Sequence, residues 1–159
     1  MRRTSGVLLH PTSLPGRYGI GEFSDEAYRF VDWLVSAGQT LWQVMPLGPT
    51  GYGDSPYQCF SAFAGNPLLI GLDALARDGA LSAADLANTP VFPDEKVDFG
   101  PVIEYKKAIL RKSYDRFATS ARAAERQDFA RFCAENATWL DDYALFIAIK
   151  DAHNGNVWN

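Results

Sequence analysis

The pattern of apolar and polar residues in the first part of the chain predicts a strand, a helix and a second strand. The apolar run from Gly6 to Pro11 is short and ends at a proline, which is typical of a buried strand. Two acidic residues follow Ser24, the expected helix N-cap, and Gly38 is expected to end the helix. A second apolar stretch from Leu41 to Leu47 predicts the second strand. This order indicates a βαβ unit with parallel strands.

The expected helix carries one apolar face, because its apolar residues recur at helical spacing: Ala27, Phe30, Val31, Leu34 and Val35. Since helices cover both faces of a parallel sheet, the two apolar strands are expected to be buried. Ligand-binding loops in such folds follow the carboxyl ends of the strands. The loop with His10 and the loop from Pro46 to Gln58 each follow a strand, so we expect them to be neighbours.

After Asn66-Pro67 the pattern becomes mostly helical. The expected segments are short helices at 73–79 and 82–88, an irregular Pro-rich stretch at 89–101, and long helices at about 102–118 and 123–153. No third strand of the series is expected. The pattern therefore predicts part of a parallel α/β architecture, and we expect the sequence to be the first part of a longer protein.

Composition narrows the classes of function. The 159 residues carry 15 basic and 19 acidic side chains, a net charge of −4, whereas nucleic-acid binding needs a clustered basic face. No stretch approaches the ~18 consecutive apolar residues of a membrane span or resembles a signal peptide. Cys59 and Cys133 lie far apart and are expected to be reduced, partly buried thiols, which favours a cytoplasmic protein. With His10 and His153 as the only histidines, neither a metal site nor a cofactor is expected.

The loop from Pro46 to Gln58 is the strongest candidate for a ligand contact, because it packs three glycines, three prolines and two tyrosines around one acid. Its residues 48–55 come close to the phosphate-binding pattern G-x-x-x-x-G-K-[ST]. However, Asp54 stands where that pattern needs lysine, and Pro56 would interrupt the helix that must follow. A nucleotide site is therefore not expected.

Two other kinds of site can be built from the residues of this loop. A nucleophilic triad of Ser55 or Cys59 with His10 and Asp54 has little support, because the chain lacks a G-x-S-x-G turn. Sugar binding fits better, since proteins hold pyranose rings with aromatic faces and a few placed polar groups. The residues that supply these groups are Tyr52, Asp54, Ser55, Tyr57 and Gln58. The alternative is that Tyr57, Phe60 and Phe63 only pack beneath the loop.

Several long segments resemble one enzyme family. They read GVLLHPTSLPG at 6–16, WQVMPLGPTGYGDSPYQ at 42–58, FSAFAGNP at 60–67 and WLDDYALF at 139–146. The first three are similar to the N-terminal region of the amylomaltases, the 4-α-glucanotransferases of the α-amylase clan, and the fourth resembles a later segment of that family. The resemblance covers essentially the whole chain in the right order.

The resemblance implies the N-terminal part of a (β/α)₈ TIM barrel, with the first two strands in 1–67 and a mostly helical inserted subdomain in 68–159. It also implies an enzyme that transfers α-1,4-glucan segments between maltodextrins by a retaining mechanism with two carboxyl groups. No segment here resembles the family's catalytic carboxylates. The 159 residues alone are therefore expected to bind substrate without turning it over.

By the same resemblance, Tyr57 lines the active-site cleft beside Asp54 and Ser55, whereas Tyr52 and Phe99 belong to a second glucan-contact region. The expected partners are α-1,4-glucans (maltooligosaccharides), with no nucleic acid and no membrane. Two alternatives stay open: a free-standing, non-catalytic α-glucan-binding module, and an α/β fragment without a ligand.

Overall fold

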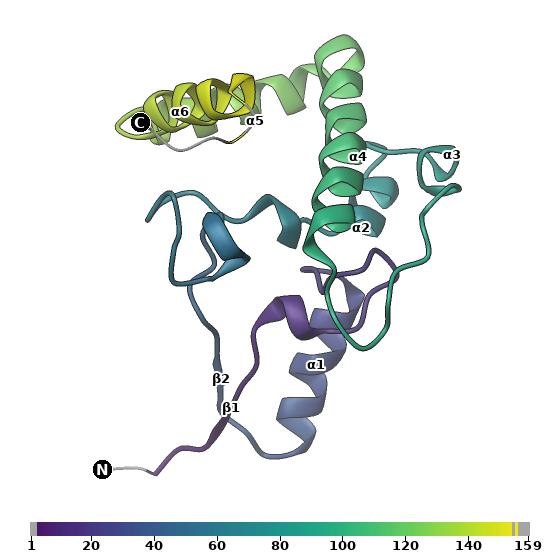
Figure 1. Ribbon diagram of the computed structural model, residues 1–159, viewed down its shortest axis with the longest axis vertical. Coiled ribbons are helices and arrows are strands. Elements are labelled where there is room, and N and C mark those ends of the chain that lie inside the picture. Colours follow the sequence, from purple (N-terminus) through teal and green to yellow (C-terminus); the bar gives the residue numbers. More distant parts are fainter. Residues whose placement is uncertain (1–2, 154, 156–159) are drawn as a thin grey trace.

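The computed structural model describes residues 3–153 and 155, apart from the side chain of Tyr52. Figure 1 shows a βαβ unit at one end of the molecule and the upright helix α4 (Phe99–Ser120) above it. Helices α5 (Ala123–Glu135) and α6 (Leu140–Ala152) extend sideways from the far end of α4. Among the helices of the described residues, none combines the length and apolar character that spanning a membrane requires.

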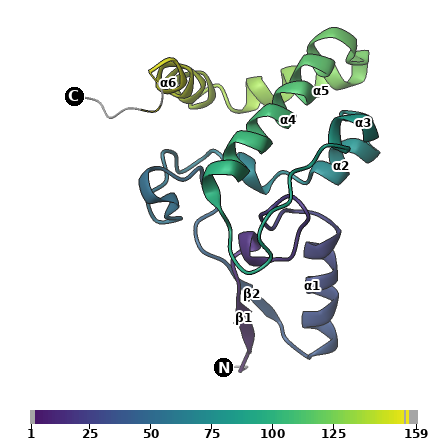
Figure 2. The same ribbon diagram turned by 45° about the vertical axis from the view of Figure 1, so that its right-hand side comes forward.

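The βαβ unit has the predicted parallel strands. Strands β1 (Gly6–Leu8) and β2 (Leu41–Gln43) pair in parallel, with Val7 opposite Trp42. Helix α1 (Asp25–Ser36) connects them and lies along one face of the pair, as Figure 2 shows. The ring of Phe30 on this helix meets the ring of Trp42 edge-on, with the centroids 4.9 Å apart.

The prediction that both strands are buried is wrong for the described structure. Leu8 is 58% exposed and Leu41 is 54% exposed, whereas Val7 and Trp42 are only partly exposed. Because side chains alternate between the two faces of a strand, Leu8 and Leu41 point away from the face that α1 covers. In the described residues the sheet has two strands, and the side chains of Leu8 and Leu41 leave its second face open to solvent.

The ends of α1 follow the sequence. Ser24 takes the N-cap position, although its side chain makes no capping hydrogen bond, and Asp25 and Glu26 occupy the first turn. Gly38 follows the C-cap with φ of +67°, a conformation that glycine adopts without strain. The apolar face is only partly covered, because Leu34 is buried and Val35 is exposed.

Of the short helical segments, α2 (Leu72–Arg77) and α3 (Ala83–Leu86) lie near the helices predicted at 73–79 and 82–88. The 3₁₀ turns η1 (Pro11–Ser13) and η3 (Pro67–Leu69) were not predicted. Ser82 caps α3 in a reciprocal capping box with Asp85. Helix α4 begins at Phe99, three residues before the predicted start.

Two buried apolar clusters join the βαβ unit to the helices. One contains Tyr18, Leu72, Leu81, Leu86 and Ile109, and the other contains Ile20, Leu68 and Val102. Each cluster therefore takes residues from both sides of position 67. The division into parts 1–67 and 68–159 remains a prediction, and the two parts share their core.

A buried ion pair stands beside these clusters. The Lys106 ammonium donates to Glu22 and also to the carbonyl oxygens of Leu68 and Ile70, at 2.7 and 2.9 Å. The Leu72 amide donates to the same Glu22 carboxylate at 3.2 Å. Burial raises the pKa of Glu22 and lowers the pKa of Lys106, because removing either charge from water is unfavourable.

The prediction of one long helix over 123–153 is wrong, because the chain forms α5 and α6 with a break at 136–139. Asn136 explains the break. Its side-chain amide donates to the Phe132 carbonyl at 2.8 Å, and its Oδ1 accepts from the Trp139 indole at 3.1 Å. A side chain that bonds to the local backbone competes with helix continuation, and Asn136 here becomes the C-cap of α5.

Candidate functional site

The loop after β2 lies next to the loop after β1, as predicted. His10 Nε2 donates to the Pro46 carbonyl at 3.3 Å, and the Asn66 amide donates to the Leu47 carbonyl at 2.8 Å. The segment between these two contacts, residues 46–66, is called the ligand loop below. It is the blue loop between β2 and α2 in Figure 1.

The ligand loop folds back on itself. Thr50 and Cys59 form an antiparallel bridge, flanked by hydrogen bonds of 3.0 Å from the Gly51 amide to Gln58 and from the Phe60 amide to Pro49. At the tip, the turn η2 (Tyr52–Asp54) has positive φ at Gly53 (74°) and at Asp54 (53°). This left-handed region favours glycine, and aspartate is one of the few other residues that enter it readily.

The structure brings three predicted site residues together in this loop. The Ser55 hydroxyl accepts a hydrogen bond from the Tyr57 amide at 3.3 Å. Tyr57 is 74% exposed, so its ring does not pack beneath the loop. Burial raises the pKa of the partly buried Asp54 carboxyl. Tyr52 lies at the tip, but its side chain is outside the described part of the structure.

These residues can bind a neutral ligand rich in hydroxyl groups. Within the described part of the chain, the Asp54 carboxylate has no hydrogen-bond or ion-pair partner and can accept from a ligand hydroxyl. The exposed ring of Tyr57 offers a flat face for an apolar sugar surface. Gln58, also exposed, adds an amide to the same loop.

A nucleophilic triad does not form here. The His10 ring is hydrogen-bonded to Thr12, with Nδ1 2.8 Å from the hydroxyl, and to the Pro46 carbonyl. The Cys59 thiol donates to the Pro56 carbonyl at 2.9 Å. The described residues also hold no group of three or more His, Cys, Asp or Glu side chains placed to bind a metal ion.

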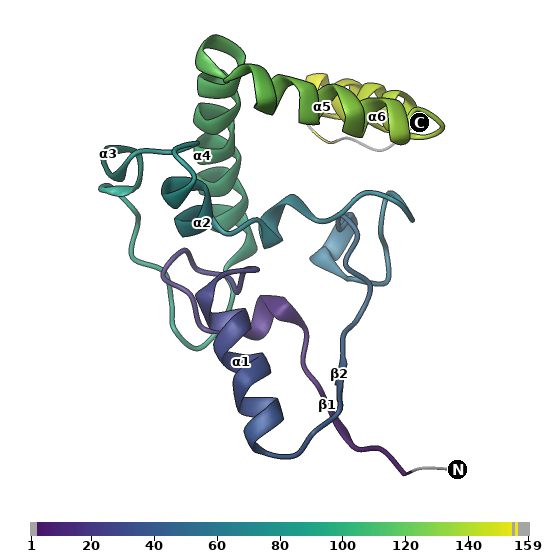
Figure 3. The ribbon, with the colours of Figure 1, turned by 180° about the vertical axis from the view of Figure 1, so that it is seen from behind.

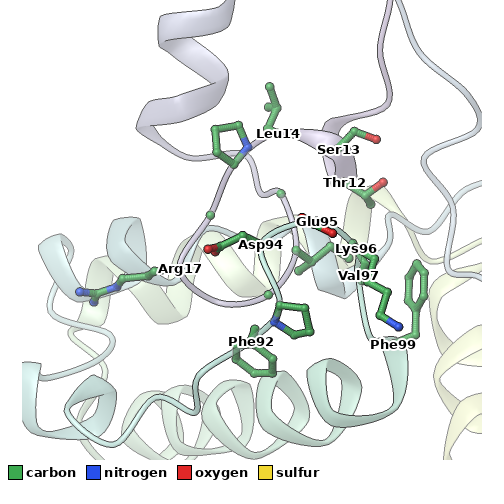
Figure 4. A pocket seen from close by; sticks show the side chains of 16 residues that line it. Thr12, Ser13, Leu14, Arg17, Phe92, Asp94, Glu95, Lys96, Val97 and Phe99 are labelled. Atoms are coloured by element: carbon green, nitrogen blue, oxygen red, sulfur yellow. The ribbon is translucent and has the colours of Figure 1, made fainter.

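Phe99 lies in a different place, at the start of α4. It packs against the buried cluster of Ile20, Leu68 and Val102 and lines a cavity of about 750 Å³. Figure 4 shows this cavity between the loop after η1 and the segment 92–99.

Phe99 is the one residue of this cavity that is a site candidate from the sequence. Asp94, Glu95 and Lys96 also line it and bring charged groups to its wall, as Figure 4 shows. One wall comes from the stretch at 89–101, predicted to be irregular and Pro-rich, and the other from the loop that follows His10. A Pro-rich composition indicates a loop, and loops often carry binding residues. It does not show that two loops about 75 residues apart in sequence will face each other.

Comparisons with known proteins find a matching family and similar enzymes. A family model described as 4-alpha-glucanotransferase matches residues 9–159. The chain is 51% identical to a 4-alpha-glucanotransferase of Synechocystis sp. over 158 residues, and 52% identical to one of Thermus thermophilus over 157 residues. Each alignment covers 99% of this chain and 31% of the relative, so the chain spans about a third of their length.

A solved structure gives the same result. The amylomaltase from Streptococcus agalactiae in complex with acarbose superimposes with a TM-score of 0.91 at 41% sequence identity. The match covers 99% of this chain and 32% of that one. The first two strands and the helices are therefore arranged as in a segment of an amylomaltase. From the matched motifs and this arrangement, the chain belongs to the 4-alpha-glucanotransferase family.

Proposed function

We propose that this chain is the N-terminal segment of a 4-α-glucanotransferase, which transfers α-1,4-glucan segments between maltodextrins. The observation that carries the proposal is that 99% of the chain aligns with one third of enzymes of that name. The acarbose complex of the Streptococcus agalactiae amylomaltase supports a glucan as the ligand class. We also propose a cytoplasmic location, although the relative in Solanum tuberosum is named chloroplastic/amyloplastic.

In this proposal the segment supplies substrate contacts through the ligand loop. Tyr57 stacks on a sugar ring, Asp54 accepts from a sugar hydroxyl, and Ser55 holds the Tyr57 backbone. Tyr52 and Phe99 contribute to a second glucan-contact region. Each contact suits a neutral polyhydroxylated chain, because it combines an apolar face with hydrogen-bonding groups at the rim.

The catalytic carboxylates are proposed to lie elsewhere in the complete enzyme. A retaining mechanism needs a nucleophilic carboxylate and an acid/base carboxyl about 5–5.5 Å apart. In the described residues, Asp54 is the carboxyl group of the ligand loop, and its raised pKa is caused by burial rather than by a second carboxylate. A single group of this kind fits substrate binding, and the 159 residues alone are expected to be inactive.

A chimera tests the proposal. Residues 1–159 replace the aligned third of the Thermus thermophilus relative, to which they are 52% identical. We expect the chimera to convert maltotriose into glucose and longer maltodextrins, and the isolated chain to release no glucose. A folded but inactive chimera would contradict the enzymatic assignment, and turnover by the isolated chain would contradict the absence of catalytic carboxylates.

Substitution in the same chimera tests the ligand loop. Tyr57→Ala should weaken maltotriose binding by about 1–3 kcal/mol, the scale of one buried aromatic contact. Tyr28→Ala is the matched control, because Tyr28 on α1 is 73% exposed and Tyr57 is 74% exposed. Equal affinities in the two variants would show that Tyr57 does not contact the glucan.

A further inference from the structure

Five aromatic rings lie where the ligand loop faces residues 139–146, the beginning of α6 and its N-cap. Phe63 of the loop stacks on Trp139 with centroids 5.9 Å apart, and Phe60 meets Phe146 edge-on at 5.6 Å. Tyr143 lies between the two helical rings, 6.2 Å from Trp139 and 6.4 Å from Phe146. We call these five residues the aromatic bridge. Figures 1 and 3 show α6 facing the loop across a gap between the ribbons. The two ring pairs join the loop to α6 across this gap.

The bridge reaches the part of the loop that carries the ligand contacts. A side chain at Gly51 would come within 3.0 Å of the Phe60 ring, so this ring lies directly against the loop backbone. The Gly51 amide donates to the Gln58 carbonyl, and Gln58 follows Tyr57. A short path therefore runs from α6 through Phe60 to the backbone that positions Tyr57.

The helical end of the bridge is held in a fixed orientation. The Trp139 indole donates to Asn136, the residue whose side chain also ends α5. The Lys150 ammonium lies 5.0 Å from the centre of the Phe60 ring, a cation–π distance. Burial raises the pKa of the Tyr143 hydroxyl, which agrees with its place inside the cluster.

Among the described residues, the loop has few other hydrogen bonds to the rest of the chain. At its base it is joined to the βαβ unit by the hydrogen bond from His10 to the Pro46 carbonyl, the Asn66 amide closes the loop on Leu47, and the hydrogen bonds at its tip stay within the loop. Contacts of aromatic pairs are worth about 0.5–1.5 kcal/mol each beyond the area they bury. Two such pairs at the far side are enough to change how firmly the loop is held.

We infer that Trp139 and Phe146 are positioning residues: through the aromatic bridge they hold the ligand loop in its glucan-binding conformation without touching the glucan. This inference rests on the proposed function, and it adds α6, about 80 residues away in sequence, to the binding site. It predicts that the packing of α6 sets the affinity of the loop for maltooligosaccharides.

The test compares Trp139→Ala with a matched control in the chimera described above. Phe117→Ala removes the same kind of contact, because Phe117 and Phe129 form an edge-on pair at 5.4 Å between α4 and α5, away from the loop. We expect Trp139→Ala to weaken maltotriose binding by about three- to tenfold. Phe117→Ala should leave binding unchanged. Trp139→Phe keeps a ring against Phe63 and should restore most of the affinity.

A second measurement separates positioning from general stability. Exchange of the Gly51 and Phe60 amide hydrogens reports the loop directly, because both amides donate within it. These amides should exchange faster in Trp139→Ala and at the native rate in Phe117→Ala. Phe63→Leu removes the same stacked pair from the loop side and should repeat the result if Trp139→Ala does not fold.

The outcomes distinguish this inference from the proposed function. If Tyr57→Ala weakens binding while neither Trp139→Ala nor Phe63→Leu changes affinity or loop exchange, the positioning role is wrong and the loop assignment stands. If Tyr57→Ala has no effect, the loop assignment itself is wrong. Weaker binding with unchanged exchange would mean that Trp139 touches the ligand, which also overturns the inference.

Discussion

Lys106 carries its charge in the interior, where its side chain has 0% exposure, so the residues around it must compensate that charge. Glu22 supplies the opposite charge, and the Leu68 and Ile70 carbonyls accept the remaining hydrogen bonds. Three segments of the chain thus meet at one ammonium group. Removing one partner of such a pair leaves the other charge buried and unpaired.

Lys106→Met should therefore lower the free energy of unfolding by about 3–5 kcal/mol, although methionine fills much of the same volume. Lys107→Met is the control, because Lys107 is 63% exposed and its pair with Asp151 lies at the surface, where such pairs contribute about 0–1 kcal/mol. Denaturant unfolding of the two variants measures the difference. Similar losses in both would mean that the buried pair does not hold the three segments together.

At the scale of elements, Asp85 joins the short helix α3 to α4. Its carboxylate accepts from the Ser82 hydroxyl at 2.6 Å, from the Ser82 amide at 2.8 Å and from Arg116 at 2.9 Å. These bonds favour the ionised form and hold the pKa of Asp85 well below its usual range. Since the folded chain binds this proton more weakly than the unfolded chain, ionised Asp85 stabilises the fold.

Asp85→Asn should lower the melting temperature at pH 7. The stabilisation is fully present above the unfolded pKa of about 3.9 and is lost as the pH falls toward the lower folded value. The difference between the native chain and the variant should therefore narrow as the pH drops below about 4. Asp115→Asn, which removes an exposed pair with Arg111, is the control. A difference that stays constant with pH would contradict the ionic role of Asp85.

Elements with strong local signals were predictable, and those that depend on one side chain were not. Helix α1 followed from Ser24, its acidic first turn and Gly38, all of which are local. The break between α5 and α6 depends on Asn136, which keeps helical spacing in the sequence. Whether an asparagine bonds to solvent or to the backbone is decided by its surroundings, and periodicity does not show it.

At the scale of the whole molecule, the ligand loop was predictable from the sequence, but the long-range contacts that hold it were not. Asp54 and Tyr57 are close in sequence, so their shared loop was visible in the motif. The aromatic bridge joins Phe63 to Trp139, and the cavity joins Arg17 to Phe99. Both connect residues that are far apart in sequence, so no local pattern contains them.

The open face of the sheet has opposite consequences for the isolated chain and for the complete enzyme. Leu8 and Leu41 lie on that face, and exposed apolar strands at a sheet edge promote self-association. Leu41→Lys should reduce concentration-dependent association of the isolated chain, measured by sedimentation. In the chimera the same change should lower the melting temperature, because there the remaining barrel is proposed to cover this side chain.

Gln43→Lys is the matched control for this last prediction. Gln43 is an exposed residue of the same strand, two positions from Leu41 and on the same face, so it adds the charge without removing an apolar group. Gln43→Lys should reduce the association of the isolated chain less than Leu41→Lys does. If Leu41→Lys reduces association of the isolated chain and does not lower the melting temperature of the chimera, this face stays in water in the complete enzyme. The strand pair would then not be part of a closed barrel, since closure leaves no open face beside β2.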